Sequence, residues 1–321
     1  MGFDPNAAAA EGSGIFGLPH SAAEAKVVLI PVPFEATTSY GRGTAGGPAA
    51  MLAASRQIDL YDVETGRPYE AGIAMLEPEP EIVRLNAEAI AAIDRDRSDT
   101  SPVDAAGRAV LERVRAVAET HLAAGKLVGV VGGDHSVPLG AILATAAREG
   151  PFGILHIDAH ADLRAAYEGF EHSHASIMHN VLERSSELSL TQVAIRDLCE
   201  AERRRIDTDH RISTFFDADL ARDRLQGRLH ARFDDIVATL PEKVYVSFDI
   251  DGLDPRFCPS TGTPVPGGLD FAEASILLER VARSRRIVGF DLTEVGPNEW
   301  DANVGARVLY KLIGWALASQ G

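Results

Sequence analysis

Short, continuous apolar runs alternate with longer amphipathic segments along the chain. The apolar runs predict strands at residues 27–32, 127–131, 153–158, 192–195, 243–249 and 286–291. They are hydrophobic at successive positions, which is typical of parallel strands covered by helices on both faces. Amphipathic segments predict helices at residues 103–124, 139–148, 174–184, 228–240, 271–283 and 303–319. This alternation predicts an α/β fold, a three-layer α/β/α sandwich with a mostly parallel sheet.

The alternation predicts one catalytic domain over residues 26–321, because neither a linker rich in Pro, Gly or Ser nor an internal repeat divides it. Residues 1–25 are expected to form an N-terminal extension. Its start is small, polar and nearly uncharged, unlike a secretory signal. No run of 18 or more apolar residues occurs, so we expect no membrane partner. The mixed charges of residues 93–101 predict a loop before the next helix.

Composition narrows the functional classes. The 321 residues include 31 Lys and Arg against 47 Asp and Glu, a formal net charge of −16. Nucleic acids and anionic membranes attract clustered cations, so we expect no nucleic-acid partner and a weak preference for cationic small molecules. Cys199 and Cys258 are too few for a disulfide framework and are not spaced as a zinc pair, which makes the cytoplasm the expected location.

Candidate chemistry lies where predicted strands end, the edge at which open α/β sheets bind ligands. In extended chain, alternate side chains face the same side, so Asp158, His160 and Asp162 can converge, as can Asp249 and Asp251. The side chains of interest at these ends are His135, Asp158, His160, Asp162, Asp249, Asp251, Asp291 and Glu294.

Charge repulsion decides what such a cluster needs. Two carboxylates about 4 Å apart repel by roughly 4 kcal/mol at an effective dielectric constant of 20. Apart from Arg164 just beyond DAHAD, these motifs hold no Lys or Arg, so metal ions are the expected counter-charge. Four carboxylates and two imidazoles suit Mn²⁺ better than a structural zinc ion. Because two of the aspartates can bridge, we expect two ions rather than one.

The remaining charge indicates the substrate. Two divalent ions would cancel four aspartates, and a bridging hydroxide together with Glu294 would leave the pocket anionic. A cationic electrophile such as a guanidinium would offset that charge. Attack of hydroxide on its central carbon is a reaction that a two-metal site can support.

Three motifs, in this order, resemble those of the ureohydrolase family of arginases, agmatinases and related guanidino-hydrolases: GGDHS at 132–136, DAHAD at 158–162 and SFDIDGLDP at 247–255. The resemblance runs from about Lys26 to the C-terminus. It implies an arginase-like α/β/α sandwich, two Mn²⁺ per chain, and hydrolysis of a guanidino compound to urea plus an amine or ammonia. It also implies a homo-oligomer, a trimer or hexamer.

The resemblance also implies roles for individual residues. One ion would be held by His135, Asp158, Asp162 and Asp249, and the other by Asp158, His160, Asp249 and Asp251. Asp158 and Asp249 would bridge the ions, and the shared hydroxide would be the nucleophile.

Two further residues match family positions. Glu294 matches the glutamate that hydrogen-bonds the guanidinium, although a helix-cap or surface carboxylate is the alternative. His174 matches a loop histidine that shuttles protons, although it can also cap its own helix and His172 lies nearby. We expect Asp162, His174 and Glu294 to be the catalytic residues.

The substrate branch follows from two segments. Residues 261–269, TGTPVPGGL, resemble agmatinases and favour conversion of agmatine to putrescine and urea. Residues 296–307 are similar instead to a branch in which some members hydrolyse free guanidine with Ni²⁺. Near Glu294, Trp300 would shorten the pocket, with ordinary packing as the alternative. Arg42, in a glycine-rich segment resembling the rim of the active site, is expected to contact substrate or else a surface or subunit. Guanidino-acid hydrolysis is a third possibility.

Other interpretations remain open. His156 is in register with Asp158 but sits deeper in the strand, which favours a place behind the ligands over direct ligation. A related deacetylase would use one zinc ion and fewer ligands, and a non-catalytic scaffold would be expected to lack at least one of the six. Metal analysis separates these classes, because they predict two, one and no bound ions.

Overall fold

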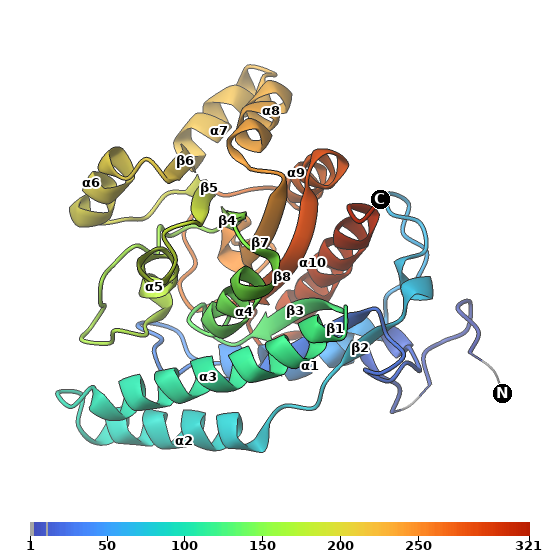
Figure 1. The fold of residues 1–321 in the computed structure, drawn as a ribbon, viewed down its shortest axis with the longest axis horizontal. Coiled ribbons are helices and arrows are strands. Elements are labelled where there is room, and N and C mark those ends of the chain that lie inside the picture. Colours follow the sequence, from blue (N-terminus) through green and yellow to red (C-terminus); the bar gives the residue numbers. More distant parts are fainter. Residues whose placement is uncertain (1–2, 11) are drawn as a thin grey trace.

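Eight parallel strands form the sheet of the computed structural model, which describes residues 3–10 and 12–321 (Figure 1). Their order across the sheet is β2-β1-β3-β8-β7-β4-β5-β6. The strands are β1 (Val27–Val32), β2 (Ile73–Met75), β3 (Leu127–Gly132), β4 (Gly153–Ile157), β5 (Ser189–Ile195), β6 (Ile212–Phe216), β7 (Lys243–Asp249) and β8 (Arg286–Thr293). The last two strands of the sequence therefore lie in the middle of the sheet, between β3 and β4.

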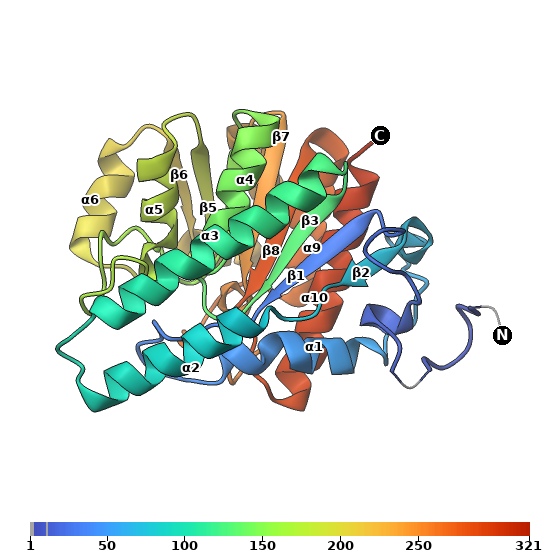
Figure 2. The same cartoon turned by 60° about the horizontal axis from the view of Figure 1, so that its bottom comes forward.

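Helices cover both faces of this sheet (Figure 2). Side chains of α3, α4 and α5 pack on one face, and side chains of α1, α7, α8, α9 and α10 pack on the other. The helices are α1 (Gly47–Ser55), α2 (Pro80–Arg95), α3 (Ser101–Ala123), α4 (Leu139–Glu149), α5 (Ile177–Arg184), α6 (Glu200–Thr208), α7 (Asp217–Leu225), α8 (Leu229–Thr239), α9 (Phe271–Ser284) and α10 (Glu299–Ala318). The predicted three-layer α/β/α sandwich is confirmed.

Local sequence accounts for the elements. Along β7, Val244 and Phe248 join the core beneath α9 and α10, while Tyr245 joins the core on the other face. Because both faces are covered, the strand reads as one continuous apolar run. The helix α9 begins with a capping box in which Asp270 and Glu273 each accept a backbone N–H of the first turn.

The sequence predictions miss the edges of the sheet. β2 and β6 are the two edge strands, and β2 has only three residues. The helices α1, α2, α6 and α7 are also additional to the predicted set. The expected loop at 93–101 is shorter, because α2 continues to Arg95 and α3 begins at Ser101.

Part of the predicted N-terminal extension packs on the domain. Ile15, Phe16 and Leu18 are buried in the core shared with α1 and α10, and the ring centroids of Phe16 and Tyr310 lie 4.7 Å apart. Residues 1–2 and 11 of the extension lie outside the described residues. The boundary at residue 25 stays a prediction. Within residues 3–10 and 12–321, no helix combines the length and hydrophobicity needed to cross a bilayer.

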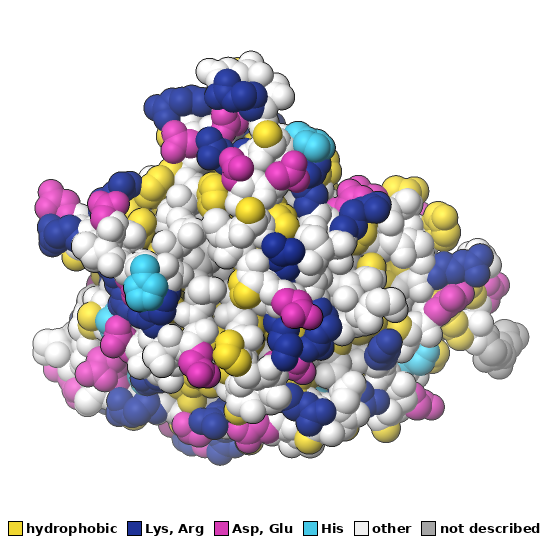
Figure 3. All heavy atoms as spheres, turned by 45° about the horizontal axis from the view of Figure 1, so that its top comes forward, with side chains coloured by type: hydrophobic (Ala, Val, Ile, Leu, Met, Phe, Trp, Pro, Cys, Tyr) yellow, Lys and Arg dark blue, Asp and Glu magenta, His cyan; other side chains and the backbone are white. Residues whose placement is uncertain are grey.

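The surface carries many of its charges in pairs. Arg84, for example, bonds both Glu81 and Glu88 on the exposed side of α2. On the face drawn in Figure 3, cationic and acidic side chains lie interspersed rather than in separate fields. Exposed pairs of this kind contribute at most about 1 kcal/mol each, so the stability of the fold depends chiefly on its buried layers.

The same Leu-to-Ala substitution at a buried and at an exposed position tests this architecture. Leu277 of α9 is 0% exposed and Leu225 at the end of α7 is 90% exposed. We expect Leu277→Ala to lower the free energy of unfolding by about 2–5 kcal/mol, because it leaves a cavity under the sheet. Leu225→Ala should change it by less than about 0.5 kcal/mol. Urea denaturation measures both, and equal effects would contradict the packing described.

Candidate metal centre

Four adjacent strands bring predicted site residues to one edge of the sheet. His135 lies in the loop after β3, Asp158 follows β4 directly, Asp249 is the last residue of β7, and Glu294 follows β8 directly. Since β3, β8, β7 and β4 are neighbours and parallel, their carboxyl ends meet at the same place. Residues up to 159 positions apart in sequence thereby come into contact, as in the 2.9 Å hydrogen bond from the His135 backbone N–H to Glu294 Oε1.

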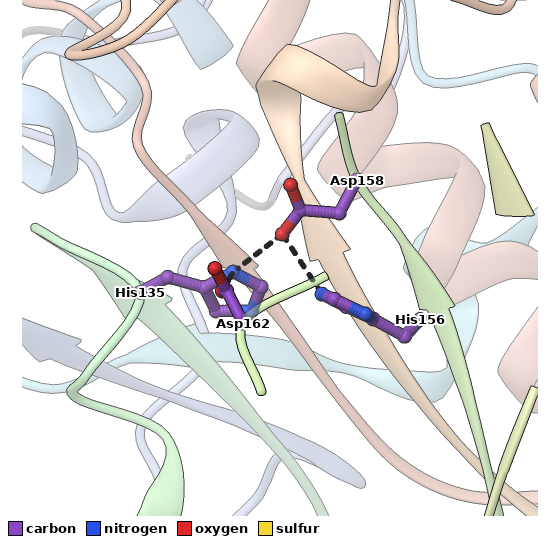
Figure 4. A group of neighbouring side chains, drawn as sticks. All are labelled: His135, His156, Asp158 and Asp162. Carbon is purple, nitrogen blue, oxygen red and sulfur yellow. Dashed lines mark hydrogen bonds and ion pairs between the residues drawn. The ribbon is translucent and has the colours of Figure 1, made fainter. Parts of the chain in front are cut away.

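The first group of ligand atoms surrounds the imidazole of His135. Its Nδ1 lies 3.0 Å from Asp158 Oδ2, 3.3 Å from Asp162 Oδ2 and 3.2 Å from Asp249 Oδ2. All four side chains are buried. Figure 4 shows Asp158 and Asp162 directed toward the ring of His135, with His156 on the other side of Asp158.

A second group lies beside the first and shares Asp158 with it. His160 Nδ1 lies 3.4 Å from Asp158 Oδ1 and 3.1 Å from Asp251 Oδ2. The two oxygens of Asp158 thus face different histidines. Asp249 links the groups as well, since its Oδ2 faces His135 while its Oδ1 accepts the Asp251 backbone N–H at 2.9 Å. The structure therefore brings all six predicted ligands together as two adjoining groups.

The electrostatics of this cluster call for cations. Burial, followed by the charges of Asp251 and Asp158, raises the pKa of Asp249 well above its usual range. Burial and then Asp158 raise the pKa of Asp162 to about 6. Burial alone would lower the pKa of His135, but hydrogen bonds to the three surrounding carboxylates raise it well above its usual value. Protons would thus accumulate here unless other cations replace them, which fits a site for divalent metal ions.

The hydrogen bonds behind His135 set its tautomer for ligation. Ser247 Oγ lies 2.9 Å from His135 Nε2 and donates its own proton to Asp291 Oδ1 at 3.0 Å. Ser247 can therefore only accept from His135, so the ring carries its proton at Nε2. A metal ion that displaces any proton from Nδ1 then finds the lone pair of this nitrogen on the side of the three carboxylates. This is the arrangement that a metal-binding histidine requires.

Two site residues adopt left-handed backbone conformations that L-residues seldom take. The φ angles are 53° at Asp162 and 61° at Glu294. At Asp162 the conformation lets the backbone carbonyl accept N–H groups of Met178 and His179, both at 3.1 Å, at the start of α5. Such strain costs about 1–2 kcal/mol per residue and is typically found at functional sites.

One of the two carboxylate oxygens of Glu294 is free to accept a hydrogen bond. Its Oε1 is engaged by the His135 backbone N–H, whereas Oε2 is buried and has no hydrogen-bond partner among the described residues. Burial, and then the charge of Asp134, raise the pKa of Glu294 well above its usual range. A buried carboxylate oxygen of this kind is a strong acceptor for a cationic N–H donor.

His174 lies beside the cluster in a neutral form. Its Nδ1 is 3.3 Å from Thr37 Oγ1, and its Nε2 is 3.3 Å from Ser39 Oγ. Thr37 donates its hydroxyl proton to Asp134 Oδ2, so it accepts from His174. Burial and the nearby His160 lower the pKa of His174 to about 4. His172, the alternative in the sequence, instead lines a different cavity with Arg108 and Arg184.

A cavity of about 250 Å³ leads to this site, and its lining includes His160, Asp162 and His174. Two of the predicted substrate contacts lie elsewhere. The guanidinium of Arg42 pairs with Asp94 of α2 at 2.8 Å. Trp300 is 52% exposed, and its indole N–H donates to the Arg256 carbonyl at 2.9 Å. Neither side chain lines the cavity.

Several polar residues near the ligands are not among the site residues predicted from the sequence. These are Thr37 and Asp134 beside His174, and Gln192, Thr214 and Ser247 beneath the ligands. For Gln192 the signal is a buried amide within an otherwise apolar strand. A buried polar group needs a partner, so its presence points to a neighbour of matching chemistry. Which neighbour that is depends on strand order, which the sequence does not display.

Comparisons with known proteins agree with this geometry. The chain matches the model described as "Arginase: Arginase family" over residues 25–317. It is 35% identical over 294 residues to N(1)-aminopropylagmatine ureohydrolase of Thermus thermophilus, covering 91% of this chain and 90% of the relative. It is 33% identical over 276 residues to agmatinase of Cronobacter sakazakii, covering 85% and 80%. The solved structure of agmatine ureohydrolase of Thermoplasma volcanium is similar, with a TM-score of 0.72, 25% identity, and coverage of 93% and 92%.

The chain belongs to the arginase family. It is a ureohydrolase, a hydrolase that acts on linear amidine C–N bonds, and its clustered histidines and aspartates agree with the binuclear metal site of that family.

Replacing Asp249 should affect the unfolding free energy differently with and without metal, because this carboxylate both binds metal and repels its neighbours. At a free Mn²⁺ concentration 100 times the dissociation constant, we expect the wild-type chain to gain about 2.7 kcal/mol in unfolding free energy. Asp249→Asn should lose most of this gain because it removes a charged ligand. In a chelator, however, it should unfold no more easily than the wild type, since it also relieves repulsion from Asp251 and Asp158.

Thermal denaturation with Mn²⁺ and with chelator measures both effects. Asp59→Asn, at an exposed position, is the matched control and should behave as the wild type does. An undiminished Mn²⁺ response in Asp249→Asn would remove this aspartate from the ligand set.

Proposed function

We propose that this chain hydrolyses agmatine to putrescine and urea. The observation that carries the proposal is the free Oε2 of Glu294, buried beside two adjoining His/Asp groups. The guanidinium is a planar cation with several N–H donors, so a buried carboxylate oxygen is its natural partner. In the net reaction the guanidino carbon gains the oxygen of water and its bond to the amine nitrogen breaks, while both protons of the water pass to the departing amine, which leaves as an ammonium.

We propose that the two groups hold a pair of Mn²⁺ ions through His135, Asp158, His160, Asp162, Asp249 and Asp251. Four carboxylates and two imidazoles form an oxygen-rich set that suits Mn²⁺, and the sharing of Asp158 supports two ions rather than one. When bound, such a pair supplies a water activated at neutral pH and polarises the group under attack. Metal analysis of the purified protein distinguishes Mn²⁺ from the alternative Ni²⁺.

The chain's own residues orient the substrate and move protons. Glu294 Oε2 accepts a guanidinium N–H and fixes the central carbon beside the metal ligands. His174 is neutral near pH 7, because its pKa of about 4 keeps the ring unprotonated. Its proton lies at Nδ1 toward Thr37, so Nε2 can exchange protons through Ser39 with the cavity. His174 thereby supports proton transfer between the site and solvent.

Removing the charge of Glu294 tests the first of these roles. Glu294→Gln should lower kcat/KM for agmatine by at least about 100-fold, which corresponds to about 2.7 kcal/mol of lost transition-state stabilisation. Its metal content should stay at two ions per chain, because Glu294 is not among the proposed ligands. A urea-release assay and metal analysis of the same sample give both results. Retained activity would contradict the role, and loss of metal would reassign the residue.

The rim of the cavity supports a substrate with a cationic tail. Tyr40, Tyr167 and Asp197 line it, and the carboxylate of Asp197 has no ion pair or hydrogen bond among the described residues. The one arginine in the lining, Arg164, has its Nε 3.6 Å from Glu202 Oε2 and its guanidinium 4.6 Å from the Tyr167 ring centroid. The terminal ammonium of agmatine therefore finds the free carboxylate of Asp197 and the exposed ring of Tyr40 at this rim.

Neutralising the rim carboxylate tests this choice of tail. Asp197→Asn should raise KM for agmatine by about three- to fivefold, the effect of an exposed ion pair of up to about 1 kcal/mol. KM for free guanidine should not change, and KM for guanidinobutyrate should fall or stay equal. Asp59→Asn again serves as control. An equal increase for all substrates would contradict recognition of the tail.

The same assay on arginine, agmatine, guanidinobutyrate and guanidine identifies the substrate class. Turnover of guanidine above agmatine would favour the guanidine hydrolase alternative. We further propose a cytoplasmic location, which the free thiols of Cys199 and Cys258 support. We also propose a homotrimer or hexamer, which the family resemblance supports. Sedimentation velocity tests this oligomeric state.

A further inference from the structure

A row of polar side chains crosses the sheet beneath the metal ligands. Thr214, Gln192, His156, Ser247 and Asp291 are paired neighbours on β6, β5, β4, β7 and β8. The last four of these are 0% exposed. In a parallel sheet, paired residues lie side by side with their side chains on the same face. We name these five residues the polar row.

The polar row lies directly below the ligands. Asp158 is two residues beyond His156, and Asp249 is two residues beyond Ser247. Because side chains alternate along extended chain, each pair projects from the same side. The polar row therefore contacts the ligands above it: His156 Nε2 lies 2.8 Å from Asp158 Oδ2, and Ser247 Oγ lies 2.9 Å from His135 Nε2.

Gln192 fixes the direction of the hydrogen bonds around His156. Its Nε2 donates to the Ala161 carbonyl at 2.8 Å, and its Oε1 accepts the Thr214 hydroxyl at 2.9 Å. A carbonyl can only accept, so the amide orientation is set. The same Nε2 lies 3.1 Å from His156 Nδ1 and must donate to it. A neutral ring that accepts at Nδ1 carries its proton at Nε2, where it faces Asp158.

His156 is also close enough to be mistaken for a ligand. One donor atom from each of His135, His156, Asp158 and Asp162 falls within a group whose members lie within 4.8 Å of one another (Figure 4). A ligating nitrogen needs a free lone pair, however, and both nitrogens of His156 are engaged, one by a donor and one by its own proton. His135 differs, because Ser247 engages only its Nε2 and leaves Nδ1 available to a metal ion.

We propose that His156 is a positioning residue that orients the shared carboxylate of Asp158 and does not bind metal itself. The proposal rests on the proposed binuclear site. The Nε2–H of His156 occupies one lone pair of Asp158 Oδ2 and fixes the rotation of the carboxylate. The second lone pair of Oδ2 then faces the His135 group, and Oδ1 faces the His160 group. Gln192, anchored to Ala161 and Thr214, holds the ring of His156 in the required tautomer.

Two substitutions of nearly equal size separate positioning from ligation. In His156→Gln the side-chain amide retains an N–H donor, whereas His156→Met has similar length and no donor. Mn²⁺ binding is measured by equilibrium dialysis with metal analysis, giving ions per chain at saturation and the dissociation constant. We expect two ions per chain in both variants. We expect the affinity to fall about 10- to 100-fold in His156→Met and less than about fivefold in His156→Gln.

Two outcomes would overturn the proposal. If His156→Met binds one ion fewer at saturating Mn²⁺, His156 is a ligand. If the Gln and Met variants have equal affinities, the donated hydrogen bond has no effect on Asp158. Should the wild type bind no pair of ions, the proposed binuclear function itself fails. A wild type with two ions and normal turnover confines any failure to the role of His156.

Gln192 provides a second pair of variants in case His156→Met does not fold. Gln192→Met removes the donor to His156 Nδ1 and should weaken Mn²⁺ binding about threefold to tenfold. Thr191→Val is the matched control on the same strand. Its hydroxyl contacts Thr239 Oγ1 at 2.9 Å, away from the polar row, so the Mn²⁺ affinity should be unchanged. Equal affinities in Gln192→Met and the control would contradict the role given to Gln192.

Discussion

Repulsion among buried carboxylates is the constraint on which the active-site edge of this protein depends. Asp158, Asp162, Asp249 and Asp251 converge from two strand ends, and among the described residues the side chains paired with their carboxylates are histidines rather than lysine or arginine. The raised pKa values of Asp162 and Asp249 express that cost. A fold can retain such an arrangement only when the binding of cations stabilises it by more free energy than the repulsion costs. The strand arrangement and the metal pair therefore depend on each other.

Strand order is how the fold assembles this cluster. The chain builds β4, β5 and β6 outward, and then returns to insert β7 and β8 between β3 and β4. This insertion places Asp249 and Glu294 beside His135 and Asp158, although the motifs lie far apart in sequence. Left-handed backbone at Asp162 and Glu294 completes the convergence at a local cost of about 1–2 kcal/mol each.

The sequence predicts what is encoded locally and misses what depends on strand order. β1 and β7 are predicted to the residue, because apolar runs with clear ends define them. The edge strand β2 is too short for a pattern to emerge. The six candidate ligands could be selected from the sequence because each lies within a motif. The positions of Arg42 and Trp300 could not be predicted, because long side chains can turn toward a partner such as Asp94 or the Arg256 carbonyl.

Strand order also places Gln192 beside His156, and their hydrogen bonds determine how the metal ligands above them are held. Every polar atom of these two side chains has a partner, and each partner restricts the next, so the amide of Gln192 determines which nitrogen of His156 bears the proton. Satisfied buried networks are rigid, whereas an unsatisfied buried oxygen such as Glu294 Oε2 can accept a hydrogen bond from a partner outside the chain. Rigid polar contacts beneath the ligands and a free acceptor beside them are therefore complementary: the first keeps the metal ligands in place, and the second leaves room for the substrate to supply the missing hydrogen bond.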